Sequence, residues 1–299
     1  MKKTRRMPWF RIFPAIALVL IGLTACEDQP PTDYVAMPFL EAYLIVGEPI
    51  ENVVVAVSQP ITERFEYARM MAAGAEVVIS GDDREFVLQY HEDDGVGSYH
   101  FPDSTYRVRP ETTYDIQVRM PDGSVLQAET TTPTRIDWMV EPRDVLQYPE
   151  DTTQLFSPDS LRIAWTRGNS IEYIIRVTAL DTLGYGMYLS PPTEEINSRT
   201  NNLQFEDPGD PQFYTKIRWG FIQANQAPTV WAAFRWYGRN EVAILAPDKA
   251  LLDWFKATQW GGRSVEYREQ YSNVRGGLGV FGSATVITKE VFLRKRPAR

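Results

Sequence analysis

Residues 39–133 alternate apolar and polar side chains in short runs that turn-forming residues separate. Gly81-Asp82-Asp83 and Pro121-Asp122-Gly123 each stand between two such runs. Alternation with a period of two is typical of strands that bury one face, and such turns are typical of hairpins. The predicted strands are residues 43–46, 53–57, 76–80, 86–90, 99–101, 113–120 and 125–131. Strands at this spacing predict an immunoglobulin-like β-sandwich, with 63–74 as a crossover loop.

Residues 134–299 predict a second β domain, a sandwich or open barrel, so that the whole chain is expected to be all-β. Pro247 and Asp248 open its one short covering helix, predicted at 248–257. Proline fits the first turn of a helix, and an acid there stabilises the helix dipole. The predicted strands of this domain are residues 161–166, 173–180, 186–190, 214–223, 229–237, 241–245, 263–269 and 280–292.

The first 25 residues carry the features of a bacterial lipoprotein signal. Five lysine and arginine residues precede an apolar stretch at 12–23, which is shorter than the roughly 20 residues that span a bilayer. Leu23-Thr24-Ala25-Cys26 follows, and Cys26 is the only cysteine of the chain. We expect cleavage before Cys26, lipid on its thiol, and an acidic, proline-rich tether at 26–38. The alternative is an ordinary secretory signal with an incidental cysteine, or a short membrane anchor.

Cleavage makes the charge balance of the chain more acidic. It removes five of the 31 basic residues and none of the 39 acidic ones, which leaves a net charge of −13. This charge argues against nucleic acid as a partner and against electrostatic adhesion to an anionic bilayer. Because no cysteine remains after Cys26, an intramolecular disulfide and a thiolate zinc site are excluded, and stability must come from a packed core.

Several segments of the mature chain match a known group of sequences. They are residues 43–47, 74–79, 110–118 and 128–133 and, most specifically, Tyr-Ser-Asn-Val-Arg-Gly-Gly-Leu-Gly-Val-Phe-Gly at 271–282. With these segments and a lipobox cysteine followed by acids, the chain resembles the Bacteroidota lipoproteins called domain of unknown function 4249. The resemblance implies an outer-membrane location, no established activity, and the company of TonB-dependent transporters. The acids after Cys26 resemble the surface-export signal of that phylum, which implies exposure at the cell surface.

Motifs for catalysis, cofactor binding or metal binding are missing from the sequence. There is no G-x-S-x-G, H-E-x-x-H or G-x-x-x-x-G-K-[ST], and His91 and His100 are the only histidines. Glu92, Asp93 and Asp94, like the acids at 206–210, gather oxygen ligands that suit calcium without the spacing of a calcium loop. We interpret both loops as solvated turns and expect neither a cofactor nor catalysis.

The glycine-rich segment 275–279 is a further candidate site. A phosphate-binding loop would need a helix after it, and a β pattern follows instead. We therefore predict a tight crossing, where glycines let one backbone approach another. Tyr271, Asn273 and Arg275 are candidate contacts for a ligand or partner in this segment.

Aromatic residues crowd the second domain, and those at 229–237 are candidates for a binding platform. If this segment is a strand, Trp231, Arg235 and Tyr237 share one face of it. An exposed tryptophan or tyrosine beside an arginine would suit a glycan or a peptide. The alternative is that these aromatic residues belong to the core.

Taken together, the sequence predicts a non-catalytic binding protein, lipid-anchored at the outer membrane and accessory to a transporter or surface assembly. One alternative is a structural or assembly lipoprotein without a small ligand, and another is a carboxylate-dependent hydrolase. A binding protein should show an aromatic-lined cleft in the second domain, and a scaffold should show a flat apolar patch. A hydrolase needs two carboxylates about 5 to 10 Å apart in a pocket.

Overall fold

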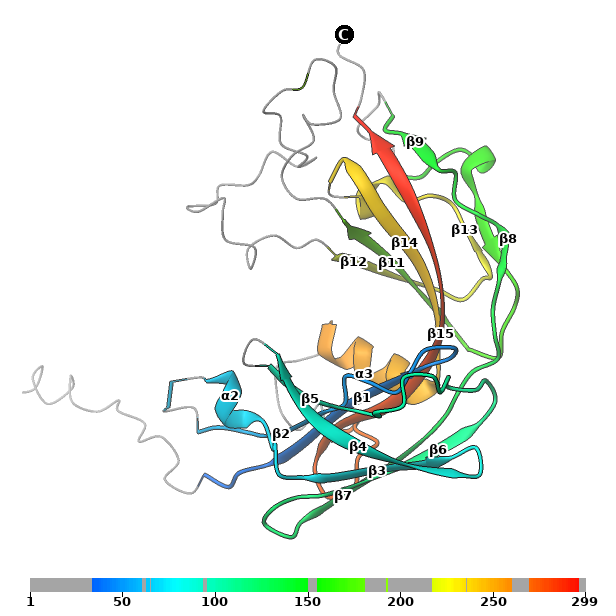
Figure 1. Cartoon of the computed structure of the whole chain (residues 1–299). Coiled ribbons are helices and arrows are strands. Elements are labelled where there is room, and N and C mark those ends of the chain that lie inside the picture. The colour runs from blue at the N-terminus through cyan, green and yellow to red at the C-terminus, as the bar shows by residue number, and fades with distance from the viewer. Residues whose placement is uncertain are drawn as a thin grey trace, which may run out of the picture. The chain divides into compact units, whose positions relative to one another are not determined.

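The structure, a computed structural model, contains an immunoglobulin-like sandwich and a second β domain with one covering helix (Figure 1). It describes residues 34–60, 63–64, 66–93, 96–149, 155–180, 192, 217–234, 236–259 and 269–295. The chain forms two compact units, Met1–Ala36 with Gln59–Phe65 and Met37–Ser58 with Glu66–Arg299, and all the sheets lie in the second unit. The predicted all-β fold class is confirmed. The predicted signal 1–25, the strand 186–190 and most of the strand 263–269 lie outside the described residues.

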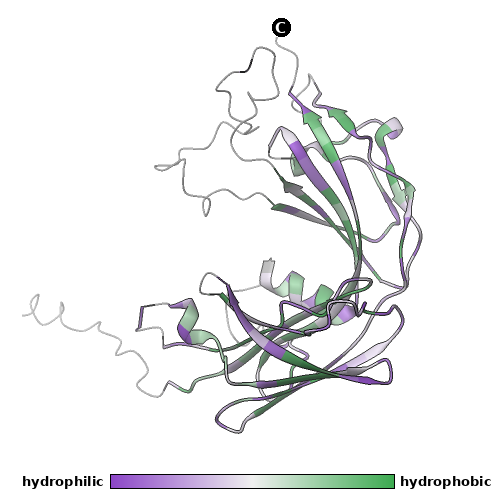
Figure 2. Ribbon diagram, in the orientation of Figure 1, coloured by the Kyte–Doolittle hydropathy of each residue, from purple (hydrophilic) through white to green (hydrophobic). Residues whose placement is uncertain are grey.

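One layer of the first sandwich is a five-stranded antiparallel sheet in the order β5-β4-β3-β6-β7. Its strands are β3 Glu76–Gly81, β4 Arg84–Asp93, β5 Val96–His100, β6 Thr113–Arg119 and β7 Val125–Thr131. Every second residue of β6 and β7 is buried, as the alternating sequence predicts. Hydrophilic residues interrupt hydrophobic ones along the strands in Figure 2. The predicted crossover 63–74 contains the short helix α2, Tyr67–Met70.

The opposite layer is formed by β1 Pro38–Ile45, β2 Val54–Val57 and the first part of β15 Leu278–Arg294. β1 begins five residues before its predicted start. The core between the layers includes Leu40, Phe86, Ile116 and Phe281, each at most 2% exposed. One C-terminal strand therefore completes the N-terminal sandwich.

Tyr114, at the start of β6, fixes the corner that leads into this strand. It is fully buried, and its hydroxyl accepts a hydrogen bond of 3.0 Å from the backbone N–H of Arg109, five residues upstream. The same hydroxyl lies 2.8 Å from that of Tyr106. A buried tyrosine bonded back to the preceding backbone is the tyrosine corner of immunoglobulin-like sandwiches, which supports this assignment independently of the strand count.

The second domain is built on an open, half-barrel sheet of seven strands. Its order is β12-β11-β14-β15-β1-β2, and β9 also pairs with β15. The added strands are β9 Val145–Gln147, β11 Tyr173–Ala179, β12 Ile217–Ile222 and β14 Gly238–Pro247. A small sheet of β8 Trp138–Val140, β10 Ile163–Trp165 and β13 Gln226–Ala227 accompanies it. The second core includes Trp165, Phe234 and Ile244, each at most 2% exposed.

The strand β15 links the two cores because different parts of one face enter each of them. Phe281 belongs to the first core, whereas Val291 and Leu293 belong to the second. Between them, the hydroxyls of Ser283 and Thr285 donate to the carbonyls of Thr131, which ends β7, and of Thr134, which follows it. The predicted second domain, 134–299, thus contains a strand that contributes to both cores.

The covering helix α3, Lys249–Gln259, begins where Pro247 and Asp248 predicted. Asp248 precedes it, and its Oδ1 accepts a hydrogen bond of 2.8 Å from the N–H of Leu251, three residues on, as an N-cap does. The helix packs against β15 at Gly282, where a Cβ atom would lie 2.8 Å from Leu251 Cβ. The predicted helix is confirmed.

The predicted strand 229–237 is wrong. A 3₁₀ turn, Trp231–Ala233, occupies this segment. Trp231 and Phe234 are three residues apart and both 2% exposed, so a tight turn directs both into the second core where a strand would separate them. The short strands β8, β9 and β13 were not predicted, because two or three residues are too few to show a period.

Candidate functional site

A large groove lies on the face of the seven-stranded sheet that carries α3. Its volume is about 780 Å³, within the usual range for ligand sites. Five of its lining residues are aromatic: Phe39, Tyr43, Trp219, Trp254 and Phe255. We name this cavity the aromatic groove.

The strand β1 contributes to the aromatic groove because both of its faces are covered. Leu40 and Leu44 point into the first core, and the alternating residues Phe39, Glu41 and Tyr43 line the groove. The sequence pattern predicted a strand only from Tyr43 onward, so Phe39 and Glu41 were not expected in a site. The signal that was available is a run with apolar residues on both faces, which is typical of a strand buried on two sides.

The helix α3 forms a wall of the groove through residues at helical spacing. Leu251, Trp254 and Phe255 stand at positions i, i+3 and i+4 and all line the cavity. The strands β11 and β12 add Arg176 and Trp219. The groove therefore combines residues from both ends of the chain, which explains why spacing in the sequence did not reveal it.

The aromatic rings of the groove pack mainly on one another. Trp219 and Phe255 make an edge contact with ring centroids 4.6 Å apart, and Phe39 lies 6.2 Å from Trp254 in a tilted arrangement. The guanidinium carbon of Arg176 lies 5.8 Å from the ring centroid of Trp219. This mutual packing holds the rings in place and occupies much of their faces.

Charged groups of both signs line the groove, and they differ in how they are paired. Arg176 forms an ion pair of 2.5 Å with Glu241 of the neighbouring strand β14. The Glu41 carboxylate accepts a hydrogen bond from the hydroxyl of Tyr43. Burial, followed by the negative charge of Glu41, raises the pKa of Tyr43 far above its ordinary value. Tyr43 thus remains a neutral donor to Glu41 at physiological pH.

The candidate contacts Asn273 and Arg275 hold the chain together at the start of β15. The Asn273 amide donates to the carbonyls of Glu129 and Phe281 and accepts from the N–H of Phe281 at 2.9 Å. The backbone of Arg275 makes two hydrogen bonds with that of Gln127 in β7. These are contacts within the chain, and the structure places Tyr271, Asn273 and Arg275 outside the aromatic groove.

The glycines that follow allow the close crossing that the sequence predicted. A Cβ atom at Gly276 would lie 2.2 Å from the carbonyl oxygen of Val125, and one at Gly279 would lie 1.9 Å from that of Leu40. Both glycines have positive φ angles, 85° and 131°, which residues with side chains rarely adopt. The prediction of a tight crossing is confirmed.

The proposed platform at 229–237 is a part of the core. Trp231 and Tyr237 are only 2% and 8% exposed and belong to the second core, and Arg235 lies outside the described residues. The prediction that Trp231 and Tyr237 are exposed ligand contacts is therefore wrong, and both side chains pack in the core. The physical reason is the 3₁₀ turn, which turns Trp231 inward.

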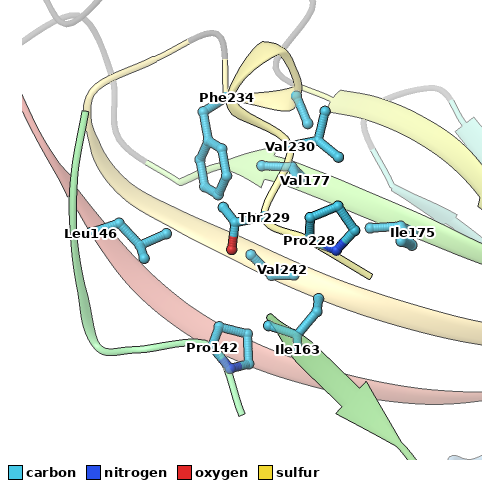
Figure 3. A pocket seen from close by; sticks show the side chains of 11 residues that line it. Pro142, Leu146, Ile163, Ile175, Val177, Pro228, Thr229, Val230, Phe234 and Val242 are labelled. Atoms are coloured by element: carbon cyan, nitrogen blue, oxygen red, sulfur yellow. The ribbon is translucent and has the colours of Figure 1, made fainter. Parts of the chain in front are cut away.

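A second cavity lies inside the second domain and is too small for an organic ligand. Its volume is about 30 Å³, room for one or two water molecules at most. Figure 3 shows Ile163, Val177 and Val242 among the apolar side chains around it. The polar lining residue Thr229 donates its hydroxyl to the carbonyl of Leu161. This cavity is a packing gap and not a binding site.

The acidic loop and the two histidines lie on the β4–β5 hairpin. Glu92 and Asp93 end β4, and Asp94 lies outside the described residues. The rings of His91 and His100 are 5.6 Å apart at their centroids, edge to face. No three His, Cys, Asp or Glu side chains in the described part of the chain form a group that would hold a metal ion. Cys26 also lies outside the described residues, and none of the described helices is long and apolar enough to cross a bilayer.

The fold and the groove together define a class: an all-β protein with an immunoglobulin-like sandwich, a half-barrel sheet and an aromatic-lined groove. Residues 38–290 match a family model, and the chain belongs to that family, described as "Domain of unknown function (DUF4249)". A search of the curated proteins finds no match.

Among solved structures, the chain is similar to two multidomain proteins. One is a 1.5-MDa bacterial ice-binding adhesin, studied for host cell surface retention, with 9% identity and a TM-score of 0.21. The other is a set of titin domains, with 10% identity and a TM-score of 0.20. The alignments cover 88% and 87% of this chain, and 65% and 66% of the other chains. Similarity at this level carries no argument about function.

Proposed function

We propose that this protein is a lipid-anchored envelope protein whose folded part binds a ligand without turnover. The observation that carries the proposal is the aromatic groove, a cavity of about 780 Å³ that combines aromatic rings with Glu41 and Arg176. Binding sites commonly pair an apolar lining with a few placed polar groups. Family membership adds no activity, so the proposal rests on the groove and on the lipoprotein signal in the sequence.

The anchor in this proposal is lipid on Cys26, and the partner is an outer-membrane transporter or another surface assembly. Cys26 follows a short apolar stretch and is the only cysteine in the sequence. The strand β1 starts at Pro38, so an extended tether of a dozen residues spans about 40 Å at most. Such a tether would keep the groove close to the membrane and to proteins embedded in it.

A structural or assembly role remains the second candidate, because apolar side chains are exposed elsewhere in the second domain. Met139 and Val140 of β8 are 65% and 50% exposed, and Val145 of β9 is 45% exposed. Exposed apolar side chains are candidates for contacts with other proteins. Substituting these residues and leaving the groove intact separates the two roles.

The test is affinity purification of the tagged, lipidated protein from native membranes solubilised in mild detergent. We expect mass spectrometry to find a stoichiometric outer-membrane transporter, and a diacylated N-terminal Cys26 peptide. Cys26→Ser should release the protein from the membrane fraction. Recovery of the protein alone after mild cross-linking would refute the transporter association, and an unmodified Cys26 would refute the anchor.

A further inference from the structure

We propose that the aromatic groove binds a short peptide segment in which basic side chains flank apolar ones. This inference rests on the proposed binding function and names the class of ligand. Three features of the groove favour such a segment: its charge, the arrangement of its rings and its size.

The charge of the groove is net negative among its described lining residues. Arg176 is the only cation there, and its charge is compensated by Glu241 at 2.5 Å. Glu41, which is half-buried, and Glu48, which is exposed, also line the groove, and neither forms an ion pair with a described residue. A carboxylate without a cationic partner in a partly buried site attracts a positive group of a ligand.

The cation on the helix beside the groove is also compensated. Lys256 of α3 forms an ion pair with Glu172, and its Nζ lies 5.4 Å from the ring centroid of Phe221. Together with Arg176 over Trp219, this places two cations against aromatic rings in the same region. Because Arg176 and Lys256 each have a carboxylate partner of their own, the Glu41 carboxylate is left to interact with a cation of the ligand.

The arrangement of the rings favours apolar amino-acid side chains over a sugar. A pyranose stacks on an open aromatic face, but Trp219 has Phe255 and Arg176 against it, and Trp254 is only 4% exposed. The lining instead combines ring edges with aliphatic side chains, including Leu245 and Val286. Such a surface accepts branched or aromatic side chains by shape and burial.

The size of the groove limits how much of a partner it encloses. A volume of about 780 Å³ lies in the range of sites that enclose a whole small ligand. A short segment of an extended chain fits this space, and a folded domain does not. The groove is thus suited to a terminus or a loop of a partner protein.

The experiment measures binding of three matched probes to the mature protein in detergent by isothermal titration calorimetry. The probes are N-acetylated, C-amidated tetrapeptides of sequence Lys-Leu-Leu-Lys, Gln-Leu-Leu-Gln and Glu-Leu-Leu-Glu. We expect the lysine peptide to bind about tenfold tighter than the glutamine peptide, and the glutamate peptide to bind weakest. A Lys-Ser-Ser-Lys peptide should bind less tightly than Lys-Leu-Leu-Lys, because it lacks the apolar side chains.

Variants of the protein locate the site of binding. Glu41→Gln should reduce the preference for lysine over glutamine to about threefold or less, and Glu48→Gln provides a second test if the first variant fails to fold. Glu85→Gln, at an exposed position of β4 outside the groove, should leave the preference unchanged. This control matters because a chain of net charge −13 attracts any cation weakly.

The outcomes distinguish this inference from the proposed function. Equal affinity for the three charge variants, or a preference unaffected by both Glu41→Gln and Glu48→Gln, overturns the basic-peptide inference. A second outcome is that no peptide binds, but a glycan binds saturably and Glu41→Gln weakens that binding. This outcome also overturns the basic-peptide inference and leaves the proposed binding function intact. If no peptide or glycan binds in the groove and no transporter copurifies, both the inference and the proposed function fail.

Discussion

Asp248 shows at the scale of one residue how a helix cap also joins two domains. Its carboxylate accepts hydrogen bonds from the Leu251 N–H at 2.8 Å and the Thr130 hydroxyl at 2.6 Å, and its own N–H donates to the carbonyl of Ser283. These bonds connect α3 with β7 and β15. Burial raises the pKa of Asp248 above its ordinary value, although the hydrogen bonds that it accepts act in the opposite direction.

The raised pKa predicts a pH-dependent contribution of Asp248 to stability. Because the folded-state pKa exceeds the unfolded one, this contribution is fully present below the ordinary aspartate pKa of 3.8 and is lost as the pH rises through the raised pKa. Asp248→Asn keeps an acceptor for Leu251 and cannot ionise. We expect the free energy of unfolding of the variant, relative to the wild type, to increase between about pH 3.5 and pH 7. Urea unfolding at several pH values measures this difference, and a difference that is constant or decreases contradicts the prediction.

At the scale of the element, β15 decides the fold because it pairs in parallel with β1 and antiparallel with β14. Its parallel half begins at a crossing so close that glycine is required. Gly279, with φ 131°, faces the carbonyl of Leu40 on β1, and the hydroxyl of Ser272 accepts its N–H. A side chain at this position would push the two strands apart.

Gly279→Ala should therefore disrupt the start of the shared strand. We expect a loss of at least about 2 kcal/mol in the free energy of unfolding, or failure to fold, because a methyl group would overlap the Leu40 carbonyl and strain the backbone. Gly220→Ala is the matched control in the edge strand β12, where no atom of the described residues lies within 4 Å of the added Cβ atom. The control should stay within about 0.5 kcal/mol of the wild type in urea unfolding. Equal effects of the two substitutions would contradict this account of the crossing.

At the scale of the whole molecule, the two cores share β15 and should unfold together. Phe281 lies in the first core and Val291 in the second, ten residues along one strand. The hydrogen bonds of Ser283 and Thr285 to Thr131 and Thr134 also connect β15 to the end of the first sandwich. Unfolding one core alone would break backbone hydrogen bonds along part of β15. We therefore expect both cores to unfold in one cooperative transition.

A substitution in the first core tests this coupling, because the described residues of the first core include no tryptophan and those of the second include Trp165 and Trp231. Ile116→Ala removes a buried side chain from the first core and should cost about 2–5 kcal/mol. We expect the tryptophan fluorescence transition in urea to shift to lower concentration and to coincide with the circular dichroism transition. An unshifted fluorescence transition would show that the two cores unfold independently.

The sequence by itself determined the elements whose signal is local. Alternation over 125–131 predicted β7 to the residue, and Pro247 with Asp248 predicted the start of α3, because one buried face or one helix end imposes its own pattern on neighbouring residues. The lipid on Cys26 also stays a prediction from the sequence alone. The prediction of a strand at 229–237 failed because a 3₁₀ turn directs Trp231 and Phe234 into the same core, and a turn of this kind has neither the period of a strand nor that of an α-helix.

Only the tertiary structure decided which distant residues meet. Phe39, Trp219 and Trp254 line one groove because β15 lies between β1 and β14, and no spacing along the chain encodes that pairing. Only the tertiary structure likewise shows that the Asn273 amide makes hydrogen bonds to the backbone of Phe281 in β15. A local pattern in the sequence shows whether one face of a strand or helix is buried. Which element covers that face is decided by the long-range packing of the whole chain.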